Sequence, residues 1–138
     1  MIFDSDWLIE FLDGAPDLDT LADRLTGCGC LVELREEGDG AEKWDVEVTT
    51  NRPDAMNHRG LAREASVAIG CRLRPLDFEL SESNEDAAEL ATVEIVEPAL
   101  CSRYVARVIR GVSVGPSPEW MQRRLTLAGV RPISNVVD

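Results

Sequence analysis

The spacing of apolar residues predicts three helices in the first half of the chain. They are expected over residues 5–13, 18–26 and 57–69, where leucine, alanine and aromatic side chains recur on one helical face. Ser5 is expected to cap the first helix, because its hydroxyl can accept a hydrogen bond from an amide of the first turn. Gly27 is expected to end the second helix in a left-handed conformation. These apolar faces indicate a core rather than a binding surface.

Alternating apolar and polar positions predict a β-hairpin between the second and third helices. One strand is expected over residues 30–35 and the other over residues 45–49. The segment from Glu36 to Lys43 is polar and contains glycine, so we expect a solvated loop. A rigid turn over residues 50–54 should follow, because Pro53 fixes its own φ and keeps the preceding residue out of a helix.

The pattern changes in the second half of the chain. Residues 80–90 are acidic and rich in serine, which indicates a linker. Strands are expected over residues 92–96 and 104–114. A helix should then open after Ser117, its expected capping residue, because a proline and an acidic residue come next. Residues 133–138 are expected to begin a further strand or extended segment.

Together these elements predict an α+β protein in unequal parts. A small helix-rich domain with a β-hairpin is expected at residues 1–79, an acidic linker at 80–92, and a partial mixed α/β segment at 93–138. The last part has too few elements to close a core of its own. We therefore expect the natural protein to continue further.

The charge limits the partners of the chain. Its 26 acidic and 14 basic residues give a net charge of −12, which would repel nucleic-acid phosphates on average. The hydrophobic content of 44% is ordinary for a soluble protein. No apolar run approaches the ~20 residues that a membrane helix needs, and the N-terminus lacks the features of a signal peptide. We therefore expect a cytoplasmic location and no membrane partner.

Few residues suggest chemistry. Cys28 and Cys30 are one residue apart, whereas zinc knuckles and thioredoxin-like sites use two, so free thiols are expected. The one histidine, His58, opens the third predicted helix and is expected to face solvent or make a local cap contact. A glycine-rich phosphate loop is absent from the sequence, and one histidine gives no credible catalytic triad. We therefore expect no catalytic residue, metal site or bound cofactor.

Three arginines form the best candidate binding cluster. Arg59 and Arg63 are four residues apart on one helical face, and Arg52 lies just upstream. They either contact phosphates or form ion pairs with neighbouring carboxylates. The acidic surplus of the chain favours ion pairing.

Three sequence blocks occur together in a specific order. The first is Ser5 to Leu12, which contains a tryptophan-bearing helix start; the second is Val46 to Asp54 followed by Arg59 to Glu64. The third extends, with gaps, from Cys101 to Asp138 and ends in Asn-Val-Val-Asp. In this order the blocks closely resemble the N-terminal region of the bacterial phenylalanyl-tRNA synthetase β-subunit family.

The resemblance implies what each part of the chain would be. In that family an OB-fold tRNA-binding domain usually interrupts the first domain, and here only residues near 36–43 occupy its place. Residues from 93 onward would begin the editing domain, which hydrolyses tyrosine wrongly attached to the tRNA, and Asn135 would lie nearest to its pocket. The synthetic site belongs to the family's α subunit. The chain alone is therefore expected to be a structural portion without catalytic activity.

The resemblance also implies the partners of the full enzyme. That enzyme would join phenylalanine to its tRNA with ATP and Mg²⁺, as an assembly of two α and two β chains. The chain would contact the α subunit and the remainder of the β subunit. Two alternatives remain: a free-standing binding or scaffold module derived from the β subunit, and an autonomous hydrolase of mischarged tRNA.

Overall fold

The computed structural model describes residues 1–37 and 41–138 and divides them into two compact units. The first unit comprises residues 1–76 and 115–138, and the second comprises residues 77–114. Residues 38–40, inside the predicted hairpin loop, lie outside the described residues. Helices and antiparallel strands are both present, which confirms the predicted α+β class.

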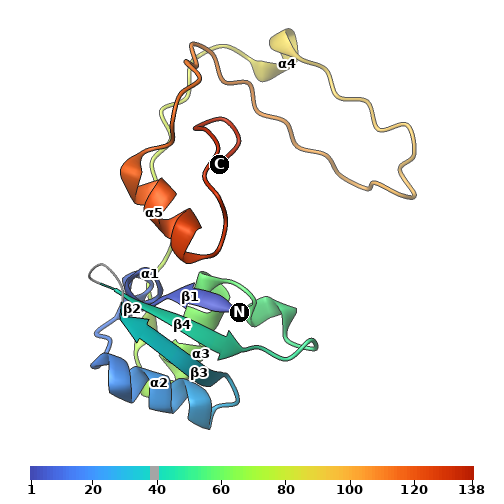
Figure 1. The fold of residues 1–138 in the computed structure, drawn as a ribbon. Coiled ribbons are helices and arrows are strands. Elements are labelled where there is room, and N and C mark those ends of the chain that lie inside the picture. The colour runs from blue at the N-terminus through green and yellow to red at the C-terminus, as the bar shows by residue number, and fades with distance from the viewer. Residues whose placement is uncertain (38–40) are drawn as a thin grey trace. The chain divides into compact units, whose positions relative to one another are not determined.

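A three-stranded antiparallel sheet lies at the centre of the first unit (Figure 1). Its middle strand, β4 (Glu42–Glu47), pairs with β1 (Ile2–Asp4) on one side and β3 (Leu31–Glu37) on the other. The pairing of β3 with β4 confirms the predicted hairpin. Strand β1 was not predicted, because three residues are too few to show an alternation.

Both hairpin strands continue into the segment from Glu36 to Lys43, which was predicted to be a loop. That prediction is wrong at both ends of the segment. The cause is a pairing of opposite charges across the strands: Lys43 Nζ lies 3.1 Å from Glu36 Oε2, and Arg35 Nε lies 2.6 Å from Glu42 Oε2. Such pairs stabilise a ladder that polarity alone would assign to solvent.

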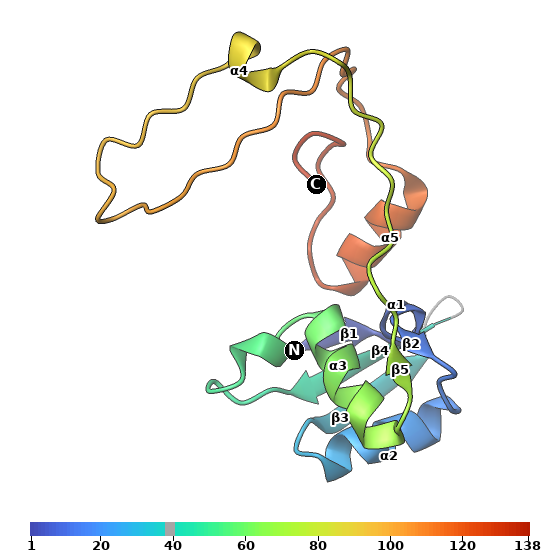
Figure 2. The same ribbon diagram turned by 180° about the vertical axis from the view of Figure 1, so that it is seen from behind.

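The three predicted helices are present. They are α1 (Ser5–Glu10), α2 (Leu18–Gly27) and α3 (His58–Ile69), and α1 is shorter than expected. Figure 2 shows α3 lying across one face of the sheet. Asn57 caps α3 by accepting from the amide of Gly60 at 2.8 Å.

Two predicted caps are wrong. Asp4, not Ser5, caps α1, because its carboxylate accepts from two amides of the first turn. Ser5 is instead buried, and its Oγ accepts from the amide of Glu42 at 2.9 Å. Gly27 is the last helical residue of α2, and the left-handed position falls at Gly29, with φ of 95°.

The core of the first unit forms where these helices meet the sheet. Trp44 is its largest fully buried side chain. The other core side chains include Phe3, Leu8, Leu12, Leu21, Leu25, Val46, Leu61 and Ala65.

A second, two-stranded sheet, β2 (Leu12–Asp13) with β5 (Arg72–Leu73), joins the chain after α1 to the chain after α3.

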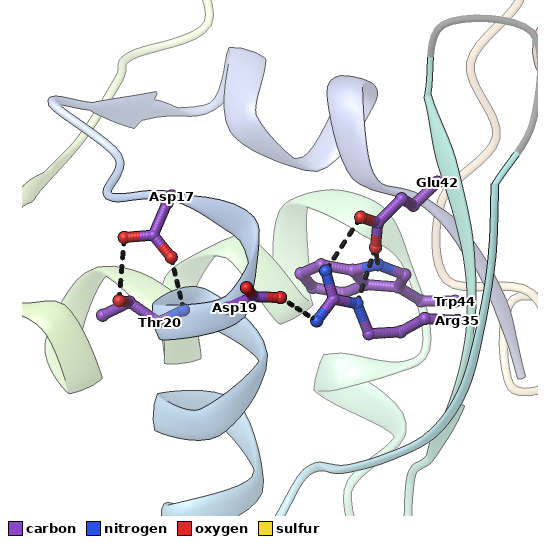
Figure 3. Close-up of polar contacts among 6 residues, drawn as sticks. All are labelled: Asp17, Asp19, Thr20, Arg35, Glu42 and Trp44. Carbon is purple, nitrogen blue, oxygen red and sulfur yellow. Dashed lines mark hydrogen bonds and ion pairs between the residues drawn. The ribbon is translucent and has the colours of Figure 1, made fainter.

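Arg35 fastens the hairpin to α2 (Figure 3). Its Nη1 lies 2.5 Å from Asp19 Oδ1, and its Nε and Nη2 bind both carboxylate oxygens of Glu42. The Arg35 guanidinium holds the pKa of Glu42 below its usual value. Glu42 also accepts from Trp44 Nε1 at 2.7 Å, and the guanidinium lies 5.7 Å from the Trp44 ring centroid. The surface residues Arg35 and Glu42 therefore fix the orientation of the buried Trp44 side chain.

The C-terminal part of the first unit contains α5 (Glu119–Leu127). Pro118 occupies its N-cap position, so the prediction of Ser117 as the cap is wrong. Ser117 is buried and donates its hydroxyl to Asp138 Oδ2 at 2.5 Å. A turn at residues 135–137 interrupts the strand or extended segment that was expected over residues 133–138.

The second unit, residues 77–114, contains α4 (Ala87–Leu90) and extended chain. The strands predicted over residues 92–96 and 104–114 are not formed within this unit, so those predictions are wrong. Alternation of apolar and polar residues favours an extended chain, but a strand also needs a neighbouring strand for its backbone hydrogen bonds, and the pattern does not provide one. Val114, on the apolar side of that pattern, is 77% exposed.

Two glycine-to-alanine substitutions in helices should have opposite effects. A Cβ on Gly60 would lie 1.9 Å from the Asp54 carbonyl oxygen, so Gly60→Ala must displace backbone. We expect a loss of about 1–3 kcal/mol in unfolding free energy. Gly27 has nothing near its Cβ position, and Gly27→Ala should gain up to about 1 kcal/mol. Urea unfolding of both variants tests this, and equal effects would contradict it.

Candidate functional site

The predicted turn between β4 and α3 is confirmed. The Arg52 amide donates to the Thr49 carbonyl at 2.9 Å, and the short 3₁₀ helix η1 (Pro53–Ala55) follows. The Arg52 guanidinium lies 2.9 Å from Asp54 Oδ2 and 2.7 Å from Glu64 Oε1. Arg52 thereby holds the pKa of Asp54 below its usual value. This guanidinium ties the turn to α3.

The other two arginines of the cluster differ from each other. Arg59 Nη1 donates to the Arg74 carbonyl at 3.1 Å, and its guanidinium lies 5.9 Å from the Phe11 ring centroid. Arg63 is exposed and forms no ion pair with any residue that the structure describes. The structure therefore engages Arg52 and Arg59 internally. A phosphate contact by any of the three stays a prediction.

Asn135 closes a loop in the C-terminal part of the first unit. Its side-chain Oδ1 accepts from the backbone N–H of Gly115, and its backbone N–H donates to the Gly115 carbonyl, both at 3.0 Å. Asn135 thus holds the entry to α5 beside the chain that follows α5. Its place near an editing pocket stays a prediction.

His58 was expected to face solvent or make a local cap contact, and both expectations are wrong. Its side chain is 9% exposed, and Nε2 accepts from the backbone amide of Asp4 at 2.9 Å. The imidazole stacks on Trp7 at a centroid distance of 4.0 Å and meets Phe3 edge-on at 5.2 Å. Burial lowers the pKa of His58 to about 4, against the opposing effect of Asp4. His58 is therefore a neutral ring at physiological pH.

The sequence contained a signal for this burial. His58 lies three and four residues before Leu61 and Ala62, which are fully buried on the apolar face of α3. Its position at the first turn, next to a capping asparagine, favoured solvent. The periodicity of the helix was the better guide.

A cavity of about 460 Å³ opens beside His58 in the first unit. Trp7 and Arg124 lie on its wall, with the guanidinium 4.9 Å from the Trp7 ring centroid and 5.5 Å from that of Trp120. Glu10 forms an ion pair with Arg124. The walls also include Phe3, Met56, Met121 and Leu125. They are mostly apolar and aromatic, as is usual for small-molecule pockets.

The thiols and carboxylates do not gather into a site. All four cysteines are free, and burial raises the pKa of Cys30. Within residues 1–37 and 41–138, no three side chains of the metal-binding types lie close enough to hold an ion. Of the helices in these same ranges, none is both long and apolar enough to cross a membrane.

Known proteins similar to this chain include phenylalanine–tRNA ligase beta subunits. The family model of the B3/4 domain matches residues 100–138. The phenylalanine–tRNA ligase beta subunit of Rhodopirellula baltica is 41% identical over 132 residues, which are 96% of this chain and 19% of that subunit. The beta subunit of Anaeromyxobacter dehalogenans is 49% identical over 94 residues, 68% of this chain and 12% of the subunit.

A third similar subunit, from Moorella thermoacetica, is 48% identical over 96 residues, 67% of this chain and 12% of its own length. The chain therefore spans about a fifth or less of the length of these relatives. No solved structure gives a significant match to the chain.

The buried histidine should make the fold sensitive to acid. Because the pKa of His58 falls from 6.5 to about 4 on folding, the unfolded chain takes up a proton first as the pH drops. The contribution of the neutral ring to the free energy of unfolding is fully present above pH 6.5 and is lost progressively as the pH falls from 6.5 to 4. We expect a loss of up to about 3 kcal/mol, measured by urea unfolding.

His58→Gln is the control for this titration, because a glutamine oxygen can still accept from the Asp4 amide. The variant should be less stable at pH 7 but lose the pH dependence between 6.5 and 5, a range in which few carboxylates titrate. A flat stability profile in the parent chain over that range would contradict the neutral buried state.

Proposed function

We propose that the chain is the front portion of the β subunit of a phenylalanine–tRNA ligase and serves as an architectural element there. One observation carries this proposal: the 41% identity with the Rhodopirellula baltica subunit over 132 of the 138 residues. A match of that length includes the turn at residues 50–54 as well as α5. Shared identity at this level over so long a stretch supports a shared role.

The internal contacts favour an architectural role over a catalytic one. Arg52 forms ion pairs with Asp54 and Glu64, and Arg59 donates a hydrogen bond to the Arg74 carbonyl. His58 is neutral and binds a backbone amide, so it is a poor candidate for proton transfer at neutral pH. The polar groups of the first unit therefore hold elements together.

The full enzyme would supply the chemistry. It would join phenylalanine to its tRNA using ATP and Mg²⁺, in the cytoplasm, as two α and two β chains. This chain would contact the α subunit and the remainder of its own subunit. Neither nucleotide nor Mg²⁺ would bind to these 138 residues.

The hairpin would lack the tRNA-binding insert that the family usually has there. Any 132-residue stretch of a 138-residue chain includes residues 36–43, so the match with the Rhodopirellula baltica subunit runs through the hairpin turn. This continuity supports a natural absence of the insert. Residues 93–138 would begin the editing domain, which the B3/4 match over residues 100–138 supports, with Asn135 near its pocket.

A chimeric subunit tests the proposal. This chain would replace the matching segment of the Rhodopirellula baltica β subunit, which would be produced together with the α subunit of that organism. We expect the chimera to copurify with α and to charge tRNA with phenylalanine at a rate within about tenfold of the parent, a barrier change below ~1.4 kcal/mol. A chimera carrying Gly60→Ala is the control and should lose assembly together with stability.

Failure of a stable chimera to assemble would favour the alternative of a free-standing scaffold module. Release of tyrosine from mischarged tRNA by the purified 138 residues would favour the autonomous hydrolase. The internal contacts of Arg52, Arg59 and His58 support neither alternative.

The arginine cluster should contribute little to tRNA binding. We expect the double variant Arg59→Ala and Arg63→Ala of the chimera to bind tRNA with unchanged affinity and unchanged salt dependence, because the chain as a whole carries a net charge of −12. Filter binding over a range of salt concentrations measures both. A decrease of about one in the salt slope for each arginine would instead assign phosphate contacts to them.

A further inference from the structure

The imidazole in the wall of the His58 cavity carries a polar atom that has no hydrogen-bond partner among the described residues. Nε2 of the neutral ring accepts from the Asp4 amide, so the proton lies on Nδ1. Nδ1–H makes no hydrogen bond with the described residues, although His58 is nine-tenths buried. The same part of the chain leaves no fully enclosed side-chain polar atom unpaired. Nδ1–H therefore reaches open space, and His58 lines the cavity.

The charged groups around the cavity are already compensated. Arg124 is paired with Glu10 and lies against two indole rings. The Asp138 carboxylate accepts from the Ser117 hydroxyl and from the Ile133 amide. An anion would find no free positive charge there, and the net charge of −12 would repel it.

The shape and the lining restrict the ligand further. A volume of about 460 Å³ lies in the range of small-molecule pockets, and indole rings from α1 and α5 add aromatic surface to its wall. A ligand without a hydrogen-bond acceptor would displace water from the Nδ1–H donor and leave it unpaired, which would weaken the free energy of binding.

We propose that this cavity binds a neutral, planar aromatic molecule that accepts a hydrogen bond from His58 Nδ1–H while its ring lies against Trp7 and Trp120. The proposal is independent of the proposed ligase function, because it rests on the cavity, the unpaired donor and the compensated charges alone.

Three small probes separate the two parts of the proposal. Benzamide has the ring and a carbonyl acceptor, toluene has the ring without the acceptor, and cyclohexanecarboxamide has the acceptor without a flat ring. We expect benzamide to bind with a Kd on the order of 1 mM and the other two roughly 3- to 10-fold more weakly. NMR signals of the Trp7 and Trp120 indole N–H groups and of the His58 Nδ1 report the binding.

The expected pattern has three elements. Benzamide should shift the Nδ1 resonance, toluene should shift the indole signals alone, and Trp44 should not respond because it is fully buried in the core. Equal affinity for benzamide and toluene would overturn the hydrogen bond to His58. Absence of any shift at millimolar benzamide would overturn the site.

A variant that fills the cavity avoids the risk of unfolding the chain. Ala128→Leu places bulk on the cavity wall and should weaken benzamide binding at least about tenfold, which corresponds to ~1.4 kcal/mol. Thr126→Leu, in the last turn of α5 beside this C-cap residue but exposed and outside the cavity, is the matched control and should bind as the parent does. Binding to the chain but not to the assembled chimera would assign the cavity to a protein segment and overturn the small-molecule ligand.

Discussion

The hydrogen bond from the Asp4 amide to His58 Nε2 connects three elements of the first unit at one point. Asp4 is the last residue of β1 and the N-cap of α1, and His58 opens α3. A sheet edge and two helix starts therefore depend on one buried pair. Neutrality of the ring is required, because a protonated imidazole has no lone pair for the Asp4 amide. Burial enforces that neutrality by lowering the pKa.

The sequence predicted the elements of the first unit well where the pattern was long. Helices α2 and α3 and the β3–β4 hairpin follow from apolar periodicity. The short strand β1 did not, because its pairing partner β4 lies about forty positions away. The cap was assigned to Ser5, whose hydroxyl is instead bound by the distant amide of Glu42. The strands expected over 92–96 and 104–114 fail for the same reason, since side-chain alternation gives no partner strand. Among the candidate site residues, His58 was misplaced because its local position outweighed the helical face it shares with Leu61.

The polar chemistry of the first unit serves its own architecture. Arg35 clamps the hairpin through Asp19 and Glu42, and Arg52 fixes the turn through Asp54 and Glu64. Because the 26 acidic residues outnumber the 14 basic ones, a guanidinium of this chain has many carboxylates with which it can form an ion pair. Exposed pairs of this kind add little stability each, but forked contacts to two carboxylates restrict geometry.

Stability and ligand binding are coupled through the same imidazole. The burial that keeps His58 neutral lets Nε2 join β1 to α3, and it also leaves Nδ1–H as an unpaired donor on the cavity wall. A ligand that accepts from Nδ1 binds the folded chain and not the unfolded one, so it must raise the stability of the first unit by mass action. Acid acts in the opposite direction, because protonation of the ring removes the Nε2 acceptor. The one histidine thus makes the fold responsive to both, and a ligand in the cavity would extend the pH range over which β1 and α3 stay joined.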